Sequence, residues 1–298
     1  MTKDIKEKNI MYYALIMLSV AMLGGCFALN DVYRKMRTSN LLSSMESSCI
    51  GAIAGLVILF LINGVKLEFT PFTLIMSFLV AINGIAFTYL SFKALDTTNL
   101  SLYSLFSMLG GMILPFMQGI IFYGEDITVA KIVCVVFICA ALALTVKKGN
   151  GKKGYIYYIG IFVLNGMSGV LSKFFTELPF EKTSAAAYSM YGAAWTVVIS
   201  GILWIVLTRC GKYQMPKLTL GAGAVAAAKG SVNRVANFIL VLALAHVDAS
   251  VQYPMVTGGV MIMSTVICLF GKNKPSKREI LSVALAFVGL LLLFVIPI

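Results

Sequence analysis

Long apolar stretches separated by short polar segments dominate the chain. The stretches run to about 20 residues with few charges, the length of α-helix that crosses a hydrocarbon core of ~30 Å. We predict ten membrane spans, which begin near Met11, Leu41, Phe72, Leu100, Ile127, Tyr155, Ala185, Leu220, Val251 and Ile280. The pattern therefore predicts an all-α polytopic membrane protein with ten transmembrane helices and short loops, without a separate extramembrane domain.

Composition agrees with this reading. Of the 298 residues, 59% are hydrophobic and 12% charged, against roughly 45–50% and about 25% in a soluble domain. The net charge of +12 resides mostly in short loops and forms no basic stripe interleaved with aromatics, so we expect no nucleic-acid partner. The six cysteines form no CxxC pair, and we predict neither a metal site nor a cofactor. The expected partners are the lipid bilayer and a small-molecule substrate.

The first span and the orientation allow two interpretations each. Basic residues followed by the apolar segment that ends at residues 23–26 resemble a lipoprotein signal. The spans that follow favour a first transmembrane helix instead, in a multi-pass protein of the plasma membrane. Lys and Arg concentrate in the loops after odd-numbered spans, for example Lys147 and Lys148. By the positive-inside rule these loops are cytosolic and both termini lie outside.

The chain resembles itself when one half is aligned with the other. Residues 1–150 form the first copy and residues 151–298 the second, and each contains five predicted spans. The matched positions include Gly24 with Gly166, Asn83 with Asn233, Gly110 with Gly259, and Gly124 with Gly271. Because five is odd, the second copy enters the membrane in the opposite sense. Inverted repeats of this kind are typical of secondary transporters, whose substrate site lies between the repeats near the bilayer midplane.

Two segments also resemble a known family. Residues 94–128, ALDTTNLSLYSLFSMLGGMILPFMQGIIFYGEDIT, and their weaker second copy at residues 243–272 are similar to EamA-type members of the drug/metabolite transporter (DMT) superfamily. The resemblance implies ten helices in two inverted five-helix repeats and a central cavity lined by helices 1, 3, 4, 6, 8 and 9. It also implies cytosolic termini, against the loop charges. Gly271-Lys272 replaces Gly124-Glu125 in the second copy, so no role is carried over to the acidic residue.

Two cations lie near the centre of the eighth span. Lys229 and Arg234 would each cost ~2.5–3.5 kcal/mol facing lipid, so we expect them to face protein or water. At about 100° per residue they share one polar sector with Asn233 and Asn237. The functional interpretation is an electropositive wall of a substrate cavity. The structural alternative is an ion pair, for example with Glu46 of the second span, which is itself a candidate proton-coupling carboxylate.

These residues define a candidate binding site. We expect the site to consist of Lys229, Asn233 and Arg234 around an acidic group of the solute, with Asn83, Tyr103 and Tyr253 opposite. Interhelical hydrogen bonding is the alternative role for the asparagines and tyrosines. The predicted function is a secondary transporter that moves a small anionic or zwitterionic metabolite, such as an amino acid, by alternating access. The alternative is a proton-coupled multidrug exporter of lipophilic cations, although the two basic residues would repel such a ligand.

Catalysis and channel function are less favoured. His246, the single histidine, lies beside Asp248 and Ser250 at the end of the eighth span, and no zinc-protease or nucleotide-binding motif accompanies it. We therefore do not expect an enzyme. No ring of charges or filter-like loop indicates a channel. Gly51 and Gly55 form a GxxxG pair that permits close helix packing in a monomer or a homodimer.

Overall fold

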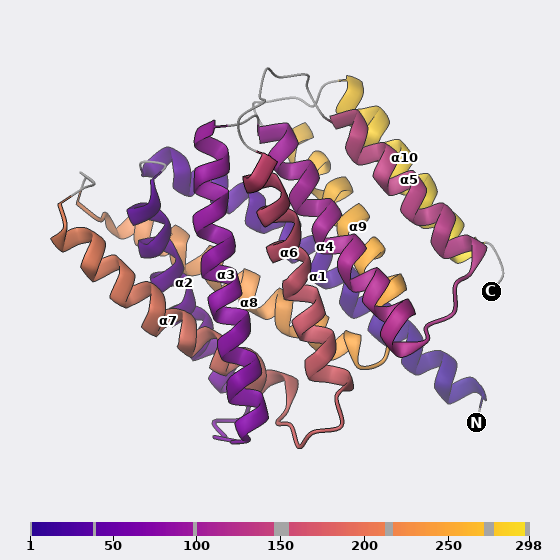
Figure 1. Ribbon diagram of the computed structural model, residues 1–298, viewed down its shortest axis with the longest axis horizontal. Helices are drawn as coiled ribbons and strands as arrows, with labels where there is room; N and C mark the ends of the chain where they lie inside the picture. Colours follow the sequence, from indigo (N-terminus) through magenta and orange to yellow (C-terminus); the bar gives the residue numbers. More distant parts are fainter. Residues whose placement is uncertain are drawn as a thin grey trace.

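The chain is built from helices packed side by side. The computed structural model describes residues 2–37, 40–97, 100–145, 155–211, 217–270 and 277–295, and in these ranges it contains ten helices and no strand. The helices are α1 (Thr2–Met36), α2 (Leu41–Ile62), α3 (Pro71–Thr97), α4 (Leu100–Tyr123), α5 (Val129–Thr145), α6 (Tyr155–Glu177), α7 (Ala185–Arg209), α8 (Leu220–Leu244), α9 (Ala249–Phe270) and α10 (Lys277–Val295) (Figure 1).

A helix is present at each predicted position. The first span was predicted to begin near Met11, and the apolar segment of α1 does begin at Ile10, but the helix itself starts earlier, at Thr2. The preceding Lys- and Glu-containing segment has good helix formers and continues the same helix outward. Asn40, Ser184 and Thr219 begin α2, α7 and α8 as N-caps, each accepting a backbone N–H three residues later.

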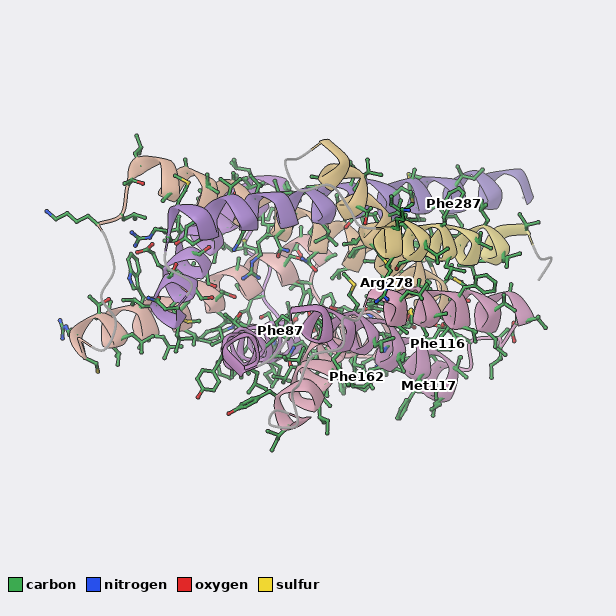
Figure 2. The ribbon with its side chains drawn as sticks, turned by 90° about the horizontal axis from the view of Figure 1, so that it is seen from above. Phe87, Phe116, Met117, Phe162, Arg278 and Phe287 are labelled. Carbon is green, nitrogen blue, oxygen red and sulfur yellow. The ribbon has the colours of Figure 1, made fainter. Side chains whose placement is uncertain are left out.

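Six helices are long and apolar enough to cross a membrane. The qualifying segments are Leu41–Ile62, Pro71–Leu90, Phe106–Tyr123, Ile159–Glu177, Ala185–Arg209 and Leu220–Leu244. The described parts of α1, α5 and α10 contain shorter apolar segments. Large apolar side chains such as Met117 on α4 and Phe287 on α10 remain exposed on the outside of the bundle (Figure 2). This arrangement is that of a multi-pass membrane protein, whose outer surface is solvated by lipid.

The two halves of the chain pack mainly against one another. Helix α1 contacts α8 and α9, α2 contacts α7 and α8, α3 contacts α6 and α7, and α4 contacts α6 and α9. Helices α5 and α10 pair along one edge (Figure 1). The interface between residues 1–150 and 151–298 therefore runs through the middle of the bundle.

Glycines bring helices from the two halves into backbone contact. A Cβ added to Gly51 on α2 would lie 2.8 Å from the Cα of Gly230 on α8. On the other side of the bundle, a Cβ on Gly166 of α6 would lie 2.5 Å from the carbonyl oxygen of Gly110 on α4. No larger residue fits at these crossings without moving the helices apart. The Gly51 half of the GxxxG pair is thus used inside the chain.

Candidate functional site

A cavity of about 710 Å³ lies between the two halves. Its walls come from eight helices: α1, α2, α3, α4, α6, α7, α8 and α9. The family resemblance implied six of these, and α2 and α7 line the cavity as well. Small-molecule sites commonly enclose about 300–1,000 Å³, so the space suits a small metabolite.

The described wall of the cavity is basic. Lys229 and Arg234 of α8 are its charged residues, and no Asp or Glu is present among the lining residues that the structure describes. The remaining polar lining consists mainly of hydroxyl and amide side chains, including Ser47, Ser168, Ser189, Thr196, Asn165, Asn233, Asn237 and Gln252. An anionic ligand group would meet favourable charge here, whereas a cation would meet no carboxylate on this wall.

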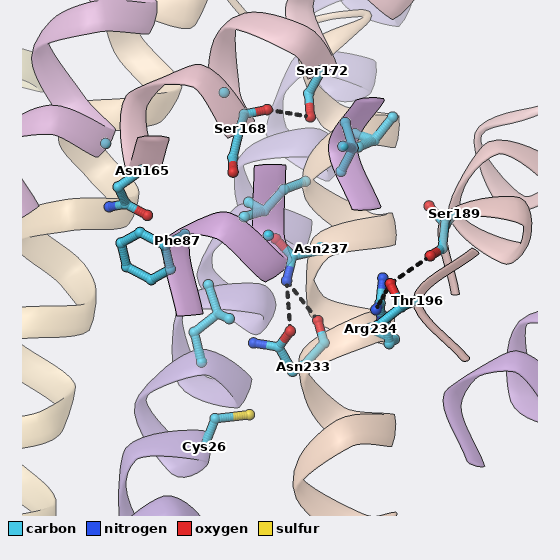
Figure 3. Close-up of a pocket in the computed structure, with 18 of the residues that line it drawn as sticks. Cys26, Phe87, Asn165, Ser168, Ser172, Ser189, Thr196, Asn233, Arg234 and Asn237 are labelled. Carbon is cyan, nitrogen blue, oxygen red and sulfur yellow. Dashed lines mark hydrogen bonds between the residues drawn. The ribbon is translucent and has the colours of Figure 1, made fainter. Parts of the chain in front are cut away.

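The side chain of Arg234, on α8, packs against α7 and α2. Its Nη2 donates a hydrogen bond of 2.7 Å to the hydroxyl oxygen of Thr196 (Figure 3). That hydroxyl donates in turn to the Gly192 carbonyl oxygen at 2.7 Å. A Cβ on Gly55 would lie 2.7 Å from the Cγ of Arg234, so a glycine is needed there to leave room for the arginine stem. The neighbouring helices thus hold the guanidinium at the cavity wall.

Lys229 points toward α1, another neighbour of α8. Its Nζ lies 5.7 Å from the ring centroid of Tyr33 on α1, close enough for a cation–π contact. The Tyr33 hydroxyl donates to Glu46 at 3.0 Å. The two cations therefore diverge, Lys229 toward α1 and Arg234 toward α7, instead of forming one two-pronged clamp.

Glu46 belongs to a buried ion pair at one end of the bundle. Its Oε2 lies 2.6 Å from Nη2 of Arg37, and both side chains are almost fully buried. Arg37 also donates to the carbonyl oxygen of Lys217, just before α8. The suggested pairing of Glu46 with Lys229 was wrong, because Arg37 and Tyr33 occupy the carboxylate. Glu46 is not among the residues that line the cavity.

The two matched asparagines lie in different environments. Asn233 is exposed within the cavity lining, where its oxygens accept hydrogen bonds from Asn237 (Figure 3). Asn83 is buried and donates to the Leu164 carbonyl oxygen and the Ser168 hydroxyl, each at 2.8 Å. Asn83 therefore connects α3 to α6 by interhelical hydrogen bonds, its alternative predicted role, and it is not among the residues that line the cavity.

The two tyrosines and the histidine complete the predicted set. Tyr253 lines the cavity, and its hydroxyl donates to the Gly169 carbonyl oxygen at 3.0 Å. The side chain of Tyr103 lies outside the described residues. His246 is exposed at the end of α8 and stacks on Tyr12 with ring centroids 4.0 Å apart, away from the cavity lining.

Sequence reasoning missed the contribution of α2 and α7. Ser47, Ser189 and Thr196 line the cavity from these helices, which the resemblance placed outside it. The small residues Gly192 and Thr196, one turn apart on α7, are the signal that could have indicated a face packed against a long polar side chain.

The comparisons with known proteins give information about the fold alone. No family model matches the chain, and no curated protein matches it. Among matching solved structures, one described simply as the crystal structure of a protein superimposes with a TM-score of 0.72. The match covers 93% of this chain and 94% of the other, at 15% sequence identity. The two chains share a fold over most of their length.

Proposed function

We propose that the protein is a secondary carrier of the EamA type in the DMT superfamily. In this proposal it moves a small anionic or zwitterionic metabolite across the plasma membrane by alternating access. The observation that carries the proposal is the basic cavity between the two halves, with Lys229 and Arg234 on its wall and no acidic residue in its described lining. A guanidinium is suited to carboxylate and phosphate groups because it presents several N–H donors in one plane.

The proposed carrier consists of two inverted repeats, residues 1–150 and 151–298. Contacts between the halves support this because they occur in exchanged pairs. The α1–α8 contact corresponds to α6–α3, α1–α9 to α6–α4, and α2–α8 to α7–α3. A two-fold operation that exchanges the halves would convert each contact into its counterpart, and such pseudo-symmetry is common in secondary transporters.

Individual glycines support the same pairing. Gly110 of α4 lies against α6, where an added Cβ would collide with the backbone of Phe162. Its counterpart Gly259 of α9 lies against α1, where a Cβ would be 2.8 Å from Cγ1 of Val20. Gly166 and Gly24 are matched in the same way, since they face α4 and α9 respectively. Residues aligned by sequence thus occupy equivalent helix interfaces.

Alternating access also needs contacts that can separate at one end of the bundle. At the end formed by the α6–α7 and α8–α9 loops, Glu125 accepts hydrogen bonds from the Ala249 and Ser250 amides. The Thr183 hydroxyl donates to Thr73, and the Ser184 amide donates to Glu68. These bonds join the two halves, and the proposed cycle requires them to break as the cavity opens toward that end.

Electrostatics disfavour the alternative substrate, a lipophilic cation. Two like charges 4 Å apart repel by about 4 kcal/mol at an effective dielectric constant of 20. A cation beside Arg234 would experience this repulsion without a compensating carboxylate in the described lining.

Electrical recording from proteoliposomes on a solid support tests the proposal. After subtraction of the signal from protein-free liposomes, we expect transient currents on addition of monoanions such as 3-phenylpropanoate or gluconate, and none with tetraphenylphosphonium, which crosses bare bilayers by itself. The Arg234→Gln variant should lose the anion response, whereas Arg209→Gln, which alters an exposed arginine at the end of α7, should retain it. Currents with tetraphenylphosphonium alone, unchanged in Arg234→Gln, would overturn the proposed function.

A further inference from the structure

Helices α3 and α8 form two walls of the cavity that the sequence alignment matches, and their side chains differ in chemistry. Since Asn83 is aligned with Asn233, the next residues, Gly84 on α3 and Arg234 on α8, are also matched. Both line the cavity. A Cβ on Gly84 would have no atom within 4 Å, so open space remains where the second half carries its guanidinium. The backbone arrangement repeats, but the chemistry of the two walls does not.

The α3 wall is predominantly apolar. Val80, Ala81, Ile85 and Phe87 line it alongside Gly84. Its two lining hydroxyls are used within the helix, because Ser77 donates to the Leu74 carbonyl oxygen and Thr88 donates to that of Gly84.

Figure 3 shows Phe87 and Arg234 on different sides of the pocket. A ligand spanning the cavity would therefore meet a cation at one end and an apolar surface at the other.

We propose that the solute is an amphipathic carboxylate with a compact aryl or branched-alkyl body. Its carboxylate faces Arg234, and its body lies against Gly84 and Phe87 on α3. This inference rests on the proposed function. A single charge is favoured because Lys229 diverges toward Tyr33 and leaves one guanidinium to face the head group.

A hydrophilic body would fit the α3 wall poorly. It would give up hydrogen bonds to water and regain few of them, since the two hydroxyls of that wall already donate to backbone carbonyls and can only accept. An apolar body would instead gain free energy in proportion to the apolar area that it removes from water.

Two monoanions of equal charge test this directly. Isothermal titration of the full chain in lipid nanodiscs, with empty nanodiscs subtracted, would compare 3-phenylpropanoate with D-gluconate. We expect 3-phenylpropanoate to bind at least roughly tenfold more tightly. Equal affinity, or tighter binding of gluconate, would overturn the proposed solute class.

Variants then locate the body. Gly84→Leu fills the open space on α3 and should weaken 3-phenylpropanoate binding at least roughly tenfold. Gly223→Leu is the matched control, since Gly223 also has no atom within 4 Å of an added Cβ and lies outside the cavity lining. Unchanged 3-phenylpropanoate affinity in Gly84→Leu would overturn the placement on α3.

Arg234→Gln separates this inference from the proposed function. If it abolishes binding of both anions while the two bind equally well in the unaltered protein, the anion site remains and only the amphipathic class fails. If neither anion binds, or binding of both is unaffected by Arg234→Gln, the proposed function fails with it.

Discussion

The carboxylate of Glu125 lies 3.1 Å from the ammonium nitrogen of Lys173, and both side chains are almost closed to solvent. Glu125 precedes α5, whereas Lys173 lies on α6, so the pair joins the two halves of the chain. The same carboxylate accepts the backbone amides of Ala249 and Ser250 at 2.9 Å each, at the start of α9. Unpaired amides at a helix N-terminus attract negative charge, so this glutamate serves an ion pair and a helix cap together.

We predict that Glu125 makes the protein more sensitive to acid. Burial alone would raise the pKa of Glu125, but hydrogen bonds from Ser250 and Ala249 and the charge of Lys173 hold that pKa below its usual value. The resulting stabilisation is complete above the unfolded-state pKa of about 4.3. It is lost as the pH falls through the lower folded-state pKa.

Thermal unfolding of the detergent-solubilised protein between pH 3 and 7 measures this effect. At neutral pH, Glu125→Gln should lower the free energy of unfolding by roughly 1–3 kcal/mol, and its Tm should fall less on acidification than that of the unaltered chain. Glu181→Gln, at an exposed loop position, is the control and should behave as the unaltered chain. Parallel Tm curves for Glu125→Gln and the unaltered chain would contradict the prediction.

The helices were predictable, because apolar runs of membrane-spanning length are local signals. The outward extension of α1 was missed, since its first turns are polar and lie outside the apolar run. In the site, periodicity placed Lys229, Asn233 and Arg234 on one side of α8, and the structure places all three in the cavity lining.

Partner choice was the part that sequence could not supply. Glu46 was suggested as a partner of Lys229 but pairs with Arg37, which is nearby in the chain but follows the end of another helix. Thr196 was not singled out at all, because a threonine becomes an arginine's acceptor only when packing brings α7 against α8. Such choices depend on how helices are rotated about their axes, which the hydrophobic pattern constrains only loosely.

Thr196 should determine how well Arg234 binds an anion. Its hydroxyl proton is used by the Gly192 carbonyl oxygen, so its oxygen is oriented to accept from the guanidinium. Thr196→Val removes that acceptor at nearly constant volume and should weaken 3-phenylpropanoate binding by about tenfold. Thr196→Ser retains the hydroxyl and should keep most of the affinity. Titration in nanodiscs measures both, and equal affinities for the valine and serine variants would remove Thr196 from the positioning of Arg234.

The crossing of α2 and α8 should not tolerate a single added methyl group. A Cβ on Gly230 would collide with the backbone of Gly51, so we expect Gly230→Ala to destabilise the protein by about 1–3 kcal/mol. Gly223→Ala on the same helix is the matched control, because its Cβ would meet no atom within 4 Å. Both changes raise helix propensity equally, so the difference in Tm isolates the steric effect. A Gly230→Ala protein as stable as Gly223→Ala would show that the helices separate freely.

The orientation of the chain can be decided at the two ends of α7. This helix meets the membrane-spanning criterion, and its 25 residues extend about 37 Å at 1.5 Å per residue. Cys210 is exposed at its carboxyl end, and Glu181 is exposed before its amino end. The loop charges place Cys210 in the cytosol, because it begins one of the basic loops after an odd-numbered span.

A membrane-impermeant maleimide should therefore label Cys210 only after the cells are permeabilised. In a Cys210→Ser background, Glu181→Cys should be labelled in intact cells, and Cys210→Ser alone should give no signal. Labelling of Cys210 in intact cells would reverse the orientation and place both termini in the cytosol, as the family resemblance implies. It would also reverse which compartment the α8–α9 end of the bundle faces, and with it the side to which breaking the Glu125 hydrogen bonds would open the cavity.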